Sequence, residues 1–173
     1  APNNTTIYFL HCIDSSNSAK MRIFSNGQVQ TPGVLFGTDT AAANTLDDYE
    51  EGTWTPAMTA ASGSYTVNDT DTKAVYTKVG NLVHWTCRIV LSSVSTPSGI
   101  LNITGLPYTS HDPGGDMNTC QAGQFLENVA SSNIGEDIIG LVPDATTYCN
   151  IRQSGTTASG NDLAAKIDAG TFI

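Results

Sequence analysis

Hydrophobic and polar residues alternate most regularly in the middle of the chain. Lys73–Val79 and Leu82–Leu91 flank the dipeptide Gly80-Asn81, an arrangement that predicts a β-hairpin with a two-residue loop. Counting outward from the loop places Tyr76 opposite Trp85, and this aromatic pair indicates the core side of the hairpin. The opposite face is expected to present Thr77, His84, Thr86 and Arg88.

The first 45 residues carry a weaker form of the same signal. Thr6–Ile13 is rich in β-branched and aromatic residues, and Met21–Phe24 leads through the hairpin dipeptide Asn26-Gly27 into Gln28–Gln30. We therefore predict an extended β arm with a linker over residues 1–45, the linker itself at 37–45. Because the arm has little apolar mass of its own, we expect partner chains or a neighbouring domain to bury what it has.

Residues 46–173 are predicted to form a head domain, an antiparallel β-sandwich of the jelly-roll type. Besides the central hairpin, we expect strands at Ile100–Thr104, Gly123–Val129, Ile138–Val142, Thr147–Arg152 and Leu163–Ile167. The segment Leu46–Gly52 carries four acids within five positions. We interpret it as a single helical turn with acids near its N-terminus, ended by Gly52; a cation or sugar site is the alternative.

Composition supports the all-β interpretation and narrows the range of partners. Charged residues make up 13% of the chain and Thr, Ser, Asn and Gly together 67 of its 173 residues, so few side chains suit the outer face of a helix. The net charge of -9 disfavours nucleic acid and anionic membranes as partners. Since the chain starts at Ala1 and ends on a strand-like Thr171–Ile173, we expect it to be a piece of a longer protein.

The four cysteines show no ligand-type spacing. Cys12, Cys87, Cys120 and Cys149 are spread along the chain, which is large enough not to need a disulfide framework. Cys87 alternates with apolar residues on one strand face and so behaves as a small core residue. We predict buried free thiols.

Common catalytic and cofactor-binding motifs are absent from the sequence. It contains no dinucleotide fingerprint, phosphate loop, H-E-x-x-H or G-x-S-x-G, and Lys73 occupies a ligand position of the one calcium-like acidic run. We therefore predict no cofactor, no metal site and no catalytic residue. Asp112 with Asp116, or Asp47 with Glu50, could form a carboxylate pair for glycoside hydrolysis, but turn chemistry alone explains both segments.

The longest polar excursion, residues 110–118, is the candidate binding loop. Binding residues concentrate on loops held by a rigid scaffold, and this loop carries His111, Asp112 and Asp116. Tyr108 precedes it and is the aromatic residue that we most expect to be exposed and able to stack on a sugar ring. These four residues are the predicted receptor-binding set.

Three sequence elements resemble bacteriophage tail-fibre and tail-spike proteins. Leu46–Pro56, L-D-D-Y-E-E-G-T-W-T-P, is similar to a motif that recurs in them, and Tyr76–Val83 and Ile103–Tyr108 resemble the Y-x-K-x-G-N-x-V and I-x-G-L-P-Y elements that follow it. Ser25–Val29 looks like the S-N-G-x-V hairpin that precedes the motif. The resemblance covers residues 46–108 in order and weakens after Pro107.

The resemblance implies a β-rich homotrimer in the virion, with a slender arm and a head that contacts the host surface or other virion proteins. It implies a non-enzymatic fibre or spike component that binds a host cell-surface glycan. A structural fibre or decoration protein acting in assembly is the first alternative, and a polysaccharide depolymerase is the second. The motif residues are expected to be structural, with Trp54 anchoring the first strand of the head; they are Asp47, Asp48, Tyr49, Gly52, Trp54 and Pro56.

Overall fold

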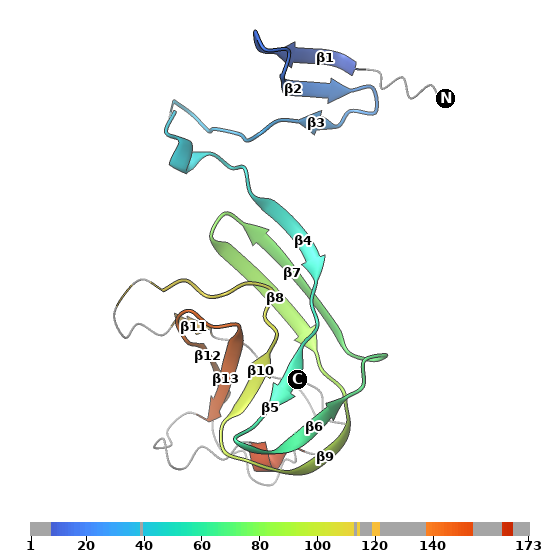
Figure 1. Ribbon diagram of the computed structural model, residues 1–173, viewed down its shortest axis with the longest axis vertical. Helices are drawn as coiled ribbons and strands as arrows, with labels where there is room; N and C mark the ends of the chain where they lie inside the picture. Colours follow the sequence, from blue (N-terminus) through green and yellow to red (C-terminus); the bar gives the residue numbers. More distant parts are fainter. Residues whose placement is uncertain are drawn as a thin grey trace. The chain divides into compact units, whose positions relative to one another are not determined.

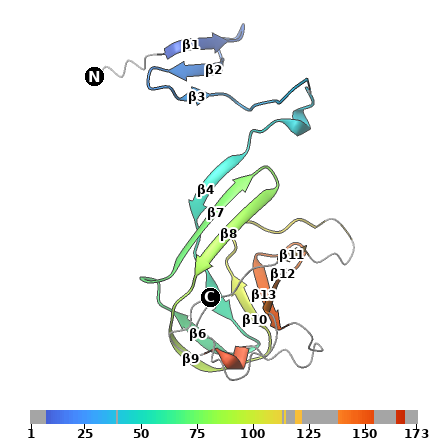
Figure 2. The same cartoon turned by 180° about the vertical axis from the view of Figure 1, so that it is seen from behind.

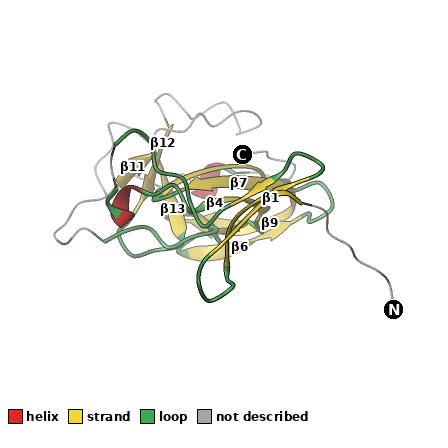
Figure 3. Cartoon of the chain, turned by 90° about the horizontal axis from the view of Figure 1, so that it is seen from above, coloured by secondary structure: helices red, strands yellow, loops and turns green. Residues whose placement is uncertain are grey.

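The computed structural model describes residues 8–38, 40–112, 114, 119–121, 138–153 and 164–167. Within these ranges the chain forms strands joined by turns, and its helical pieces are two single 3-10 turns, Ala42–Asn44 (η1) and Ala164–Lys166 (η3) (Figure 3). The strands are Tyr8–Ile13 (β1), Ala19–Phe24 (β2), Val29–Gln30 (β3), Tyr49–Thr53 (β4), Ala57–Thr59 (β5), Ser62–Val67 (β6), Lys73–Val79 (β7), Leu82–Arg88 (β8), Leu91–Ser98 (β9), Leu101–Thr104 (β10), Thr119–Gln121 (β11), Ile138–Val142 (β12) and Tyr148–Gln153 (β13). The prediction of an all-β fold is confirmed.

The chain divides into two compact units. The first runs to Glu50 and includes Lys78–Leu82, the tip of the β7–β8 hairpin; the second contains Glu51–Thr77 and continues from Val83. The predicted arm therefore corresponds to part of a unit that also contains the first five residues of the acidic segment, Leu46 to Glu50, and a hairpin tip from much later in the sequence. No helix in the described part of the chain is long and apolar enough to cross a membrane.

The first unit contains a three-stranded antiparallel sheet of β1, β2 and β3 (Figure 1). Asp14 forms the first turn, where its carboxylate accepts hydrogen bonds from the backbone N–H groups of Ser16 and Ser18, both at 2.9 Å. Gly27 forms the second turn with φ +87°, a conformation that glycine adopts without strain. The second turn lies at the Asn26-Gly27 dipeptide, as the sequence predicts.

The two faces of this sheet differ in chemistry. One face carries Leu10, Ile23 and Val29, which lie opposite one another across the three strands, and the pair Cys12 and Met21. The other face carries the cross-strand set His11, Arg22 and Gln30.

Apolar exposure is concentrated in the first unit. Eleven of the thirteen large apolar side chains that are exposed among the described residues belong to it, including Phe9 at 78% and Val29 at 57%. The buried apolar residues of the described core all belong to the second unit. The described residues of the first unit thus leave the apolar face of its sheet uncovered.

The predicted linker is a loop with its ends held together. Val34 and Leu46 form an antiparallel bridge in which each backbone N–H donates to the other's carbonyl at 2.9 Å. Between them η1 forms a single turn. The segment is therefore part of the folded unit.

The core of the second unit lies against a five-stranded sheet of order β11-β12-β13-β10-β5 (Figure 2). Alternate residues of its inner strands are fully buried, among them Leu101, Ile103 and Ile151. Ile89, which follows β8, and Leu91, the first residue of β9, belong to the same apolar cluster, and Tyr65 of β6 and Trp85 of β8 pack against it. The core is therefore enclosed by different sheets, as the sandwich prediction requires.

Most strand positions agree with the sequence, with two clear errors. The strand predicted at Leu82–Leu91 ends at Arg88 as β8, and Leu91 begins β9, which pairs with β6 in another sheet. β12 coincides with the predicted Ile138–Val142, and the strands predicted at Ile100–Thr104 and Thr147–Arg152 are β10 and β13 within a residue at either end. The predicted Gly123–Val129 lies outside the described residues. The strand predicted at Leu163–Ile167 is wrong: η3 forms there and buries Ala164 and Ile167, which are three positions apart and so share one side of a tight turn.

The cysteine prediction holds for two of the residues. Cys149 is buried and Cys87 is partly buried against the core, and both are free thiols. Burial raises the pKa of each thiol from 9.0 to about 11. Cys12 is exposed on the arm sheet, which contradicts the prediction, because none of the described residues of the first unit covers that face; the side chain of Cys120 lies outside the described part of the chain.

Candidate functional site

The motif segment at residues 46–56 is extended, and the predicted helical turn is wrong. Tyr49–Thr53 forms β4, the edge strand of a sheet of order β4-β7-β8. Glycine does not end a helix here, because Gly52 lies inside the strand. The strand forms because β7 offers a neighbouring edge that satisfies the backbone groups of the segment.

Asp48 holds the tip of the β7–β8 hairpin. Its carboxylate pairs with the ammonium group of Lys78, and its carbonyl oxygen accepts a hydrogen bond from the Gly80 N–H at 2.9 Å. The Lys78 side chain is 16% exposed and that of Asp48 50%, so the ion pair is only partly open to solvent. Asp48 thereby connects the motif segment to the loop that the sequence predicted at Gly80-Asn81.

Gly52 gives space to an aromatic ring. A Cβ atom at this position would lie 2.6 Å from Cε1 of Tyr76 and 2.7 Å from its Cζ and Oη atoms. The Tyr76 ring in turn meets Tyr108 edge to face, with ring centroids 5.5 Å apart and an interplanar angle of 82°. Glycine is required here for close packing, since any side chain would displace Tyr76.

Trp54 joins the end of β4 to the core. Its backbone N–H donates to Ala74 O and its indole Nε1–H to Val75 O, each at 3.3 Å. Its ring lies edge to face with Trp85 at a centroid distance of 5.7 Å and packs against the buried cluster. Trp54 thus lies at the junction of β4 and the described core, and its role as an anchor stays a prediction.

The three segments that carry the tail-fibre resemblance meet in one place. Gly52 contacts Tyr76, which contacts Tyr108, and a Cβ atom at Gly105 would lie 2.5 Å from Thr55 O. Pro56, the last residue of the first segment, is buried. We call the contacts among Gly52, Thr55, Tyr76, Gly105 and Tyr108 the motif joint. The edge-to-face aromatic contact and the close packing at the two glycines give it the character of a structural element.

Two motif residues lie outside the joint. Asp47 and Tyr49 are exposed, Tyr49 at 62%.

The predicted receptor-binding residues are not brought together as one surface. Tyr108 is half-buried against Tyr76 rather than exposed as expected, because the motif joint takes up its ring. His111 and Asp112 are exposed. The Asp112 carboxylate accepts a hydrogen bond from the Gly114 N–H at 2.9 Å, an interaction that is typical of an aspartate in a turn. Asp116 lies outside the described residues.

The start of this loop is firmly held. Ser110 N–H donates to Thr146 O at 2.8 Å, and the Ser110 hydroxyl donates to Pro143 O at 2.5 Å. Thr146 N–H returns a hydrogen bond to the same hydroxyl at 3.0 Å. His111 therefore follows a residue whose backbone and side chain are both held by hydrogen bonds. Binding residues on loops are commonly positioned by such a scaffold.

A second cluster, which no sequence motif marks, lies on the polar face of the arm sheet. Arg22 contacts Tyr8, His11 and Gln30, and a pocket opens beside it. The alternation of Lys20 and Arg22 with Met21 and Ile23 was the available signal. No group of three or more potential metal-ligating side chains occurs among the described residues.

Comparison with known proteins gives a structural likeness to a phage protein. No protein-family model and no curated protein matches the chain. The crystal structure of the Dettilon tailspike protein superposes with a TM-score of 0.55 at 21% sequence identity, over 72% of this chain and 22% of that one. The chain thus spans about a fifth of the tailspike. The likeness shows that the all-β fold described above is similar to a fold found in a phage tailspike protein.

Proposed function

We propose that this chain is a segment of a bacteriophage tail fibre or tailspike that attaches the virion to a glycan on the host cell surface without cleaving it. The observation that carries the proposal is the likeness of its fold to the Dettilon tailspike protein. The sequence resemblance over residues 46–108 supports the same class. The protein would accordingly belong to the virion.

The active form is a homotrimer in this proposal. The apolar face of the arm sheet supports it, because Leu10 and Val29 are 45% and 57% exposed and none of the described elements of the unit covers them. Soluble chains rarely leave a contiguous apolar sheet face in water, and a three-stranded sheet needs such a face packed to be stable. Equivalent faces of other copies would cover it.

Solution mass tests the assembly. Light scattering coupled to size exclusion should give three times the mass of the chain, and Val29→Asp should dissociate the trimer because it places a charge in the apolar interface. Ser15→Asp, in an exposed turn, is the matched control and should leave the mass unchanged. A monomeric wild-type protein would contradict the homotrimer.

Binding to host cells and to purified surface polysaccharide tests the function. The trimer should bind cells and leave the viscosity of the polysaccharide unchanged. Loss of viscosity that Asp112→Ala abolishes would instead establish a depolymerase. Absence of cell binding, together with electron micrographs that locate the chain against the capsid or tail tube, would favour an assembly role.

A further inference from the structure

We propose that the polar face of the arm sheet binds an anionic group, a carboxylate or a phosphate, carried on a saccharide. The inference deepens the proposed attachment function and rests on it for its biological setting. All the residues that form the proposed site belong to the first unit. It assigns a site that differs from the loop at residues 110–118.

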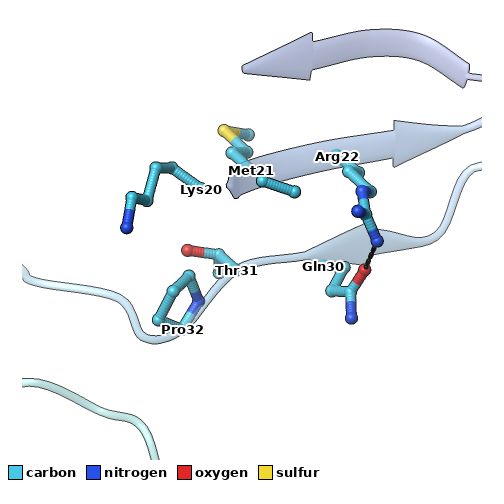
Figure 4. Close-up of a pocket in the computed structure, with 7 residues that line it drawn as sticks. Lys20, Met21, Arg22, Gln30, Thr31 and Pro32 are labelled. Carbon is cyan, nitrogen blue, oxygen red and sulfur yellow. Dashed lines mark hydrogen bonds between the residues drawn. The ribbon is translucent and has the colours of Figure 1, made fainter. Parts of the chain in front are cut away.

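A pocket of about 330 Å³ opens on this unit between β2 and the segment that follows β3. In Figure 4, Lys20 and Arg22 extend from β2 on the side where Gln30, Thr31 and Pro32 lie. The volume lies at the lower end of the range that small-molecule sites occupy. Its polar lining consists of two cations, an amide and a hydroxyl, which are donors suited to an oxygen-rich anion.

The Arg22 guanidinium is held in place before any ligand arrives. Its Nε–H donates to His11 Nε2 at 3.2 Å and its Nη1 donates to Gln30 Oε1 at 3.0 Å. The guanidinium carbon lies 5.5 Å from the centroid of the Tyr8 ring, which itself packs on His11 and Phe24. A guanidinium has five N–H donors and these two hydrogen bonds use two of them, so an ordered fork remains for a carboxylate or phosphate.

Charge makes the pocket unusual in this chain. The protein has 7 Lys and Arg against 16 Asp and Glu, yet two of the seven cations line this one pocket. The Asp14 carboxylate lies 3.0 Å from Lys20 Nζ, and the Lys20 side chain is 58% exposed. Asp14 therefore offsets the positive charge of Lys20, and the positive charge of Arg22 remains in the pocket. The local balance favours an anion where the chain as a whole repels one.

The two faces of the arm sheet can act at the same time. The apolar residues Leu10, Ile23 and Val29 lie on the face opposite Arg22. If neighbouring copies cover Leu10, Ile23 and Val29, Lys20 and Arg22 stay open to solvent on the other face, whereas Met21, which also lines the pocket, belongs to the apolar face. Trimer formation would then present three copies of the pocket, so that weak sites could act together.

Surface plasmon resonance on the full-length protein tests the site. The immobilised probes are polyglucuronate for the carboxylate, phosphorylated mannan for the phosphate, and dextran as the neutral polysaccharide. Binding is expected to at least one anionic probe and not to dextran, and to weaken as salt rises. Arg22→Gln should weaken it by about 10- to 100-fold, the range expected for loss of a hydrogen bond to a charged group.

The control variants separate the site from general charge and from folding. Lys73→Gln removes an exposed cation of the second unit and should change binding by less than about twofold. Lys20→Gln changes a largely exposed side chain and should also weaken binding to the anionic probe. If Arg22→Gln fails to fold, this variant tests the site in its place. Wild-type protein that binds no anionic probe, or Lys20 and Arg22 variants that bind as the wild type does, would overturn the inference.

The two proposals fail in different experiments. Host-cell binding that persists in the Arg22 and Lys20 variants, with no binding to either anionic probe, leaves the attachment function and removes this site. Anionic binding that depends on Arg22 in a protein that binds no host cell supports the site and removes the attachment function.

Discussion

Replacement of Gly52 by alanine tests the packing of the motif joint. The added Cβ atom would lie 2.6 Å from Cε1 of Tyr76, well inside the contact distance of two carbon atoms. The same ring also meets Tyr108 at a centroid distance of 5.5 Å, and this contact limits its movement. Gly52 has no positive φ, so the effect of the substitution is steric.

The magnitude follows from two opposing terms. Forcing one extra methyl group into a packed site costs about 1–3 kcal/mol. Alanine also restricts the unfolded chain, which returns about 0.4–1 kcal/mol. The net loss in the free energy of unfolding should be about 1–2 kcal/mol, which lowers the Tm of a chain of this size by about 2–8 °C.

Urea denaturation of a double-mutant cycle measures this term. Gly52→Ala is combined with Tyr76→Leu, which removes the ring that the new methyl group meets. In the Tyr76→Leu background, Gly52→Ala should be neutral or slightly stabilising, giving a coupling energy of about 1 kcal/mol or more. Thr53→Ala, an exposed neighbour on β4, is the matched control and should change stability by less than about 0.5 kcal/mol. If Gly52→Ala is as stable as the wild type while Tyr76 is present, the packing argument is refuted.

The remaining predictions concern the core, the thiols and the first turn. Trp54→Ala should cost about 3 kcal/mol in urea denaturation, from lost packing and the lost indole hydrogen bond, whereas Trp54→Phe keeps an aromatic ring and should cost about 1 kcal/mol; equal losses would contradict the role of ring packing. In the native protein at pH 8, iodoacetamide should modify exposed Cys12 first. Cys87 and Cys149 should react only on unfolding, because burial raises their pKa values to about 11. Peptide mass mapping shows the order, and equal rates of modification of the three thiols in the native protein would contradict it. Hydrogen bonding, chiefly from the Ser16 side chain, lowers the pKa of Asp14 from 3.8 to about 2. The ionised carboxyl should therefore stabilise the first turn fully above pH 3.8, and this stabilisation should be lost as the pH falls toward 2. An NMR titration of the Asp14 carboxyl with a midpoint near 3.8 would refute this.

Much of the local structure could be predicted from short stretches of sequence. Asn26-Gly27 and Gly80-Asn81 specify their hairpins because few residue pairs tolerate the backbone of a two-residue turn. The scarcity of helix formers and the abundance of Thr specify the all-β class for a similar reason, since both are properties of single residues and their neighbours.

The candidate sites could be predicted only in part. The motif predicts structural roles for Trp54 and Gly52, but their partners Val75 and Tyr76 are more than twenty residues away, a contact that no local pattern reveals. Tyr108 is expected to be exposed from its polar neighbours, whereas its ring meets Tyr76. The cluster around Arg22 has no sequence signature because its members come from three strands and share a face only once the strands are in register.

The sequence by itself determined that this chain is all-β, where its tight turns lie, and that its first segment is too poor in apolar residues to bury its own apolar face. The tertiary structure decided what each ambiguous segment becomes. Leu46–Gly52 favours a helical turn in isolation but becomes extended where β7 offers it backbone partners, and Leu163–Ile167 has the pattern of a strand but closes into a turn that buries Ala164 and Ile167. The physical reason is that short segments have weak intrinsic preferences, so the hydrogen bonds and burial offered by distant parts of the chain determine their conformation.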